Sequence, residues 1–140
     1  MAQDTKMLNQ IHQTTQMGQI GIEAVIDRTR DAELRKALRQ QLTEYGQICE
    51  TAGELLHQHG ATAKDISPMA KLCSKMASGI RRDHSAPKIA EMMIQGNTRG
   101  MVKSMHAIRQ LDVMDPKVQE LSNKLLRTEQ ANIEQMKQYL

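Results

Sequence analysis

Hydrophobic and small residues in the first half of the chain recur at steps of three and four, the spacing of one face of an α-helix. The first stripe predicts a helix over about 4–28, and the second predicts a helix from Asp31 to Gly60. Asp31 suits the N-cap, and Gly60 suits the left-handed position that ends many helices. Because so few residues join the two helices, we expect an antiparallel hairpin. The stripes are Leu8, Ile11, Thr15, Gly18, Ile22 and Val25, then Leu34, Leu38, Leu42, Tyr45, Cys49, Ala52 and Leu56.

The second half of the chain repeats this pattern. A capping Ser85 followed by Pro87 predicts the start of a third helix, and Asp115 followed by Pro116 predicts the start of a fourth. These two helices form a second predicted hairpin. Their stripes are Ile89, Met93, Gly96, Gly100, Ser104, Ala107 and Leu111, then Val118, Leu121, Leu125, Thr128, Asn132 and Met136.

A long connection separates the two predicted hairpins. Ser67 and Pro68 begin a shorter stripe that predicts an extra helix over 67–82. An up-and-down bundle would need only a short link at 60–85, so this length favours a crossover. We therefore predict a single all-α domain spanning 1–140, a four-helix bundle of two antiparallel hairpins with an extra short helix in the crossover.

Composition excludes several classes of protein. No apolar run approaches the roughly 20 residues that span a bilayer, and the N-terminus lacks the pattern of a secretory signal, so we expect a cytoplasmic protein without membrane association. Cys49 and Cys73 have no paired spacing, which indicates reduced thiols in the core. The net charge is +3, but the chain has only two tyrosines and neither Phe nor Trp, which disfavours stacking on nucleic-acid bases. A solvated helix face better explains the basic residues Lys64, Lys71, Lys75, Arg81, Arg82 and Lys88.

Glycine and methionine are used unusually. Glycine inside a helix costs about 1 kcal/mol relative to alanine, so we expect close packing at Gly18 and Gly21 and at Gly96 and Gly100. A cavity for an apolar ligand is the alternative. Eleven methionines can fill a core without Phe, or they can form an adaptable binding surface. The third helix carries Met on more than one face, and we expect a homo-oligomer, a dimer first, through such surfaces. These residues are Met92, Met93, Met101 and Met105.

Polar residues gather near the midpoints of the four predicted helices, which antiparallel packing brings to one level. We hypothesise that Arg99 or Lys103 neutralises Glu44 or Glu129 there as an ion pair. The alternative is that these charges face water. The predicted mid-level layer contains Gln16, Gln19, Glu23, Glu44, Gln47, Arg99, Lys103, Glu129 and Asn132.

The two-hairpin layout, with Glu44-Tyr-Gly-Gln47 and Glu129-Gln-Ala-Asn132, resembles the ferritin-like superfamily. In that family two helices each supply a Glu-x-x-His pair and the other two each supply a Glu. Here Gln47 and Asn132 replace both histidines, and the third helix offers Arg99 and Lys103 in place of a carboxylate. An amide is a poor ligand for iron.

The resemblance therefore implies a divergent bacterial member that lacks the di-metal histidines. It implies a non-enzymatic bundle without a cofactor and with a structural or partner-binding role. Some bacterial proteins of this shape, including spore-coat-like ones, also lack metal ligands. The alternative is an iron- or manganese-dependent oxidase or peroxide-handling protein with an atypical site at Glu23, Glu44 and Glu129.

Overall fold

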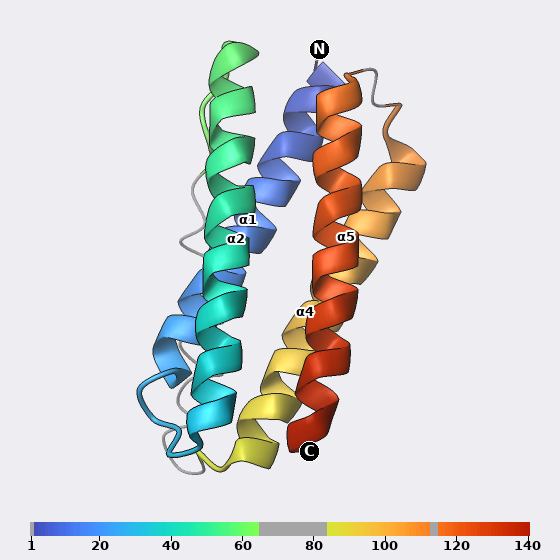
Figure 1. The fold of residues 1–140 in the computed structure, drawn as a ribbon. Helices are drawn as coiled ribbons and strands as arrows, with labels where there is room; N and C mark the ends of the chain where they lie inside the picture. Colours follow the sequence, from blue (N-terminus) through green and yellow to red (C-terminus); the bar gives the residue numbers. More distant parts are fainter. Residues whose placement is uncertain (1, 65–83, 113–114) are drawn as a thin grey trace.

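The computed structural model describes residues 2–64, 84–112 and 115–140. These ranges contain four α-helices and no strand, which confirms the predicted all-α class for this part of the chain (Figure 1). The predicted helix at 67–82, with Cys73 and four of the basic residues, lies outside the described residues. The helices are α1 (Ala2–Val25), α2 (Ala32–Gln58), α4 (Ala86–Gln110) and α5 (Pro116–Met136), and a short 3₁₀ helix, η1 (Lys137–Tyr139), follows α5.

The first hairpin forms close to the predicted boundaries. Asp31 caps α2, because its Oδ1 accepts hydrogen bonds from the backbone N–H groups of Glu33 and Leu34 at 3.0 Å each. Gly60 follows α2 with a φ of +72°, the left-handed conformation that the sequence indicated. Helix α1 ends at Val25, three residues earlier than predicted, since the Arg28 N–H bonds to the Val25 carbonyl and closes a turn there.

The second hairpin begins at the two predicted caps. Ser85 Oγ accepts a hydrogen bond from the Lys88 N–H at 3.4 Å, and Asp115 Oδ1 accepts one from the Lys117 N–H at 2.9 Å. Proline stands in the first turn of both α4 and α5. Proline at these positions sacrifices no helical hydrogen bond, because the first N–H groups of a helix have no partner within the helix.

The four helices lie alongside one another. Helix α1 packs against α2 and α4, and α5 packs against α4 and α2. In Figure 1 α1 runs opposite to α2, α4 runs opposite to α5, and α2 and α4 point the same way. The end of α2 lies beside the start of α5, where His59 Nε2 is 3.0 Å from Asp115 Oδ2.

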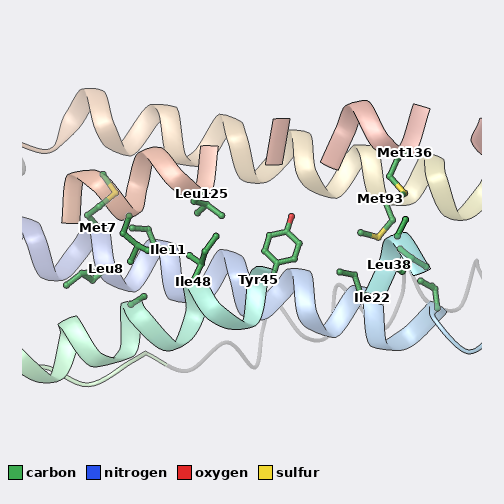
Figure 2. Close-up of a cluster of buried hydrophobic side chains, with 14 of the residues drawn as sticks. Met7, Leu8, Ile11, Ile22, Leu38, Tyr45, Ile48, Met93, Leu125 and Met136 are labelled. Carbon is green, nitrogen blue, oxygen red and sulfur yellow. The ribbon is translucent and has the colours of Figure 1, made fainter. Parts of the chain in front are cut away.

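The interior between the helices is mainly aliphatic, with methionine in place of phenylalanine. Met7, Met93 and Met136 are buried, and Tyr45 is the only aromatic residue in the buried core of the described ranges. Figure 2 shows buried side chains from all four helices spread along the interior, with Met7 toward one end and Met93 and Met136 toward the other. Cys49, a free thiol in α2, is only half-buried rather than fully in the core, and this burial raises its pKa.

Candidate functional site

A cluster of polar side chains lies inside the protein. Tyr45 comes from α2, Asn97 from α4, and Glu129 and Asn132 from α5. None is more than 3% exposed. Buried polar groups normally have hydrogen-bond partners, so this central polar cluster is the most unusual part of the interior.

Tyr45 connects the helices within the central polar cluster. Its hydroxyl donates a hydrogen bond to Oδ1 of Asn97. Its ring lies against Gly18 of α1, where an added Cβ would be 2.7 Å from the Tyr45 Cε2 atom. Burial raises the pKa of Tyr45 strongly, the Glu129 carboxyl raises it further, and the Asn132 amide opposes the change. The phenol therefore stays protonated and remains a hydrogen-bond donor.

Glu129 is the most deeply buried member of the central polar cluster. Its side chain is 0% exposed, and neither carboxyl oxygen has a hydrogen-bond partner among the described residues. Burial raises the pKa of Glu129 to about 8, because the charged form is poorly solvated away from water. At neutral pH the carboxyl group is therefore mostly protonated and uncharged.

Gly100 makes room for Glu129. A Cβ added at Gly100 would lie 2.5 Å from Oε2 and 2.6 Å from Oε1 of Glu129. The absence of a side chain at Gly100 therefore leaves the space that the buried carboxyl group occupies. The Nδ2 atoms of Asn97 and Asn132 and the Oγ atom of Ser104 are also buried without a partner among the described residues.

Together the central polar cluster and the Ser104 hydroxyl offer hydrogen-bond donors and acceptors, and they carry at most one negative charge, that of Glu129.

The remaining residues of the predicted mid-level layer are spread over different faces. Glu44 is half-buried, and burial raises its pKa while nearby Lys124 lowers it. Gln16 is half-buried, as is Gln19, whose Nε2 atom would be 3.3 Å from a Cβ added at Gly46. The exposed members are Glu23, Gln47, Arg99 and Lys103.

The structure does not bring the candidate metal ligands together. Glu23 is exposed, Glu44 is half-buried and Glu129 is fully buried. Among residues 2–64, 84–112 and 115–140, no group of three His, Cys, Asp or Glu side chains is arranged to hold a metal ion.

The hypothesis that Arg99 or Lys103 pairs with Glu44 or Glu129 is wrong, because no such pair exists among the described residues. Asn97 points inward from α4, and each residue turns the helix by about 100°. Arg99, two positions later, therefore points outward and is exposed.

The sequence pattern placed Gly96 in the interior and did not mark Asn97. Asn97, and not Gly96, faces the interior, and a Cβ added at Gly96 would have no neighbour within 4 Å. Gly21 is equally open, so only one glycine of each predicted pair is tightly packed. The signal for Asn97 was its spacing of three from Gly100 and seven from Ser104, which places all three on one face.

The outer surface of α4 is the second unusual feature. Four large hydrophobic residues of the described chain are exposed. Three of them lie within two turns of α4, namely Val102, Met105 and Ile108. We call these three residues the α4 strip. They are 53%, 44% and 38% exposed, respectively. Exposed apolar residues that gather in one place mark interaction surfaces, whereas scattered ones are ordinary.

Comparison with known proteins gives no relative for this chain. No family of known proteins, no curated protein and no solved structure matches it. No helix in the described ranges is long and apolar enough to cross a membrane.

Proposed function

We propose that this chain is a non-enzymatic, ferritin-like four-helix bundle that works by binding a protein partner through the outer surface of α4. The observation that carries the proposal is the α4 strip, which leaves Val102, Met105 and Ile108 open to solvent. Apolar side chains in such a position are stabilised when a partner removes them from water. Met105 adds adaptability, because an unbranched thioether can fit surfaces of different shape.

The helix directions support the ferritin-like part of the proposal. Helices α2 and α4 point the same way (Figure 1), so the end of α2 and the start of α4 lie at opposite ends of the bundle. Two antiparallel hairpins joined by one long crossover are the layout of ferritin-like folds. The short helix at 67–82 belongs to this crossover in our proposal.

Metal analysis tests the non-enzymatic part of the proposal. The protein would be purified after growth with iron and manganese and its metal content measured, before and after anaerobic addition of Fe(II). We expect no stoichiometric metal, since amides stand where the ferritin-like family has histidines. Stoichiometric metal that is lost in the Glu129→Gln variant would refute the proposal.

That outcome would instead support the second candidate function, a metal-dependent oxidase or peroxide-handling protein. One observation favours it: Glu129 holds two buried carboxyl oxygens without a partner among the described residues. Metal would also lower the fraction of protonated Glu129, since a cation stabilises the carboxylate.

Sedimentation velocity tests which partner binds the α4 strip. The homodimer that we expected from the sequence would sediment as a dimer, and the Val102→Ser/Met105→Ser variant would sediment as a monomer. A monomer at all concentrations would exclude a second copy and leave the strip to a different protein. The control is Asn123→Ser, at an exposed polar position on α5.

A further inference from the structure

We propose that the α4 strip binds an acidic amphipathic helix of a different protein. This inference rests on the proposed function and adds the chemistry of the partner. It depends on two features of α4: a short apolar strip of helical spacing, and a row of basic side chains beside it.

The apolar part fits a helix. Val102, Met105 and Ile108 follow one another at steps of three, and they span about 9 Å along the axis at 1.5 Å per residue. Half-buried Ile94 and Met101 continue the apolar surface on the Ile108 side of the strip. A partner helix with apolar residues at steps of three and four matches a surface of this length.

The charged part indicates the sign of the partner. No acidic residue occurs between Met92 and Gln110. Arg99, Lys103 and Arg109 are exposed in the same segment, and none of them joins an ion pair among the described residues. By helical spacing, Arg99 and Lys103 lie along the Val102 side of the α4 strip, and Arg109 lies one turn from Met105. We call Arg99, Lys103 and Arg109 the basic edge. Acidic side chains on a partner would complement the charge of this edge.

Charge disfavours a second copy at the α4 strip, and composition disfavours a lipid surface. A second copy packed through this surface would bring another basic edge to the interface, and like charges across an interface oppose binding. A lipid surface would attract the basic edge, but interfacial helices use Trp, Phe or Leu to enter the bilayer. The α4 strip has none of these residues.

The test uses two synthetic helical peptides of equal length with the same leucine face. One carries glutamate on its polar face and the other carries lysine. Binding of each labelled peptide to the full chain would be measured by fluorescence anisotropy, and the methyl NMR signal of Met105 would report where it binds. We expect the acidic peptide to bind roughly tenfold more tightly at low salt, because it can form an exposed ion pair with each of the three basic side chains.

Two variants separate the inference from the proposed function. Val102→Ser/Met105→Ser removes the apolar contact, so it should weaken both peptides. The edge variant, Arg99→Gln/Lys103→Gln/Arg109→Gln, should remove only the preference for the acidic peptide. The matched control is Lys6→Gln/Lys36→Gln/Arg39→Gln, which removes the same charge from exposed positions on α1 and α2.

The outcomes are distinct. Equal binding of both peptides at Met105, or a preference that survives in the edge variant, would overturn the acidic partner while keeping the binding surface. No binding by either peptide would overturn both proposals if the chain is also monomeric. A dimer that Val102→Ser/Met105→Ser dissociates would replace the acidic partner with a second copy. Co-sedimentation with phosphatidylglycerol vesicles without peptide binding would replace it with a lipid surface.

Discussion

Replacing Glu129 with glutamine should stabilise the protein at neutral pH and leave it nearly unchanged in acid. Glutamine has the size of the protonated acid but cannot ionise. Burial holds the pKa of Glu129 at about 8 in the folded protein, against an ordinary value of 4.5. Between these values the unfolded chain releases a proton that the folded protein retains.

The sign and size of the effect follow from this difference. Since the unfolded state binds fewer protons in this range, the free energy of unfolding falls as the pH rises from about 4.5 to about 8. At 1.36 kcal/mol per pH unit, the full loss is roughly 5 kcal/mol, and at neutral pH it is roughly 3 kcal/mol. Below pH 4.5 both states hold the proton, so the loss disappears there.

Urea unfolding followed by far-ultraviolet circular dichroism, repeated from acid to alkaline pH, would measure the effect. The Glu129→Gln variant should lack the decline in stability that the natural chain shows up to about pH 8. Glu120→Gln, at an exposed position on the same helix, is the control. If Glu129→Gln and the natural chain gave parallel stability curves, Glu129 would ionise in the folded state as it does in water, and the reasoning would be refuted.

Three further predictions concern neighbouring contacts. Gly100→Ala should destabilise the fold by about 1–3 kcal/mol, because its Cβ would overlap Glu129. Gly96→Ala should instead stabilise it by up to about 1 kcal/mol. Equal effects of the two substitutions in urea unfolding would contradict the packing at Gly100. Tyr45→Phe should cost about 1–2 kcal/mol, since Asn97 loses its donor, and an unchanged unfolding midpoint would argue against that hydrogen bond. The Lys117 N–H and the His59 side chain both lower the pKa of Asp115. His59→Ala should therefore raise this pKa in a carboxyl NMR titration, yet leave it below its ordinary value because the Lys117 N–H still donates. An unchanged pKa of Asp115 would exclude the His59 contact.

Local signals in the sequence predicted the helices well. Asp31, Ser85 and Asp115 cap the helices as expected, and Gly60 adopts the left-handed conformation. These features depend on hydrogen bonds and backbone preferences within a few residues, so one segment of sequence contains all the necessary information.

The interior of the candidate site could be predicted only in part. Steps of three and four are both compatible with one helix face, so the pattern on α4 admitted Gly96 as readily as Asn97. What selects Asn97 is the Tyr45 hydroxyl on α2, a contact between residues 52 positions apart. For the same reason the polar pattern of α5 did not reveal that Glu129 would be buried, because the space for it is provided by Gly100 on another helix.

The fit of Glu129 onto Gly100 favours one alignment of α4 and α5 along their length. Sliding one helix by a turn, about 5.4 Å, would bring Glu129 opposite Asn97 or Ser104, whose side chains would fill the space that Gly100 leaves. Flexible methionines could accommodate such a shift, since they repack easily. The space at Gly100 thus favours the observed register in an interior that methionine would otherwise let repack.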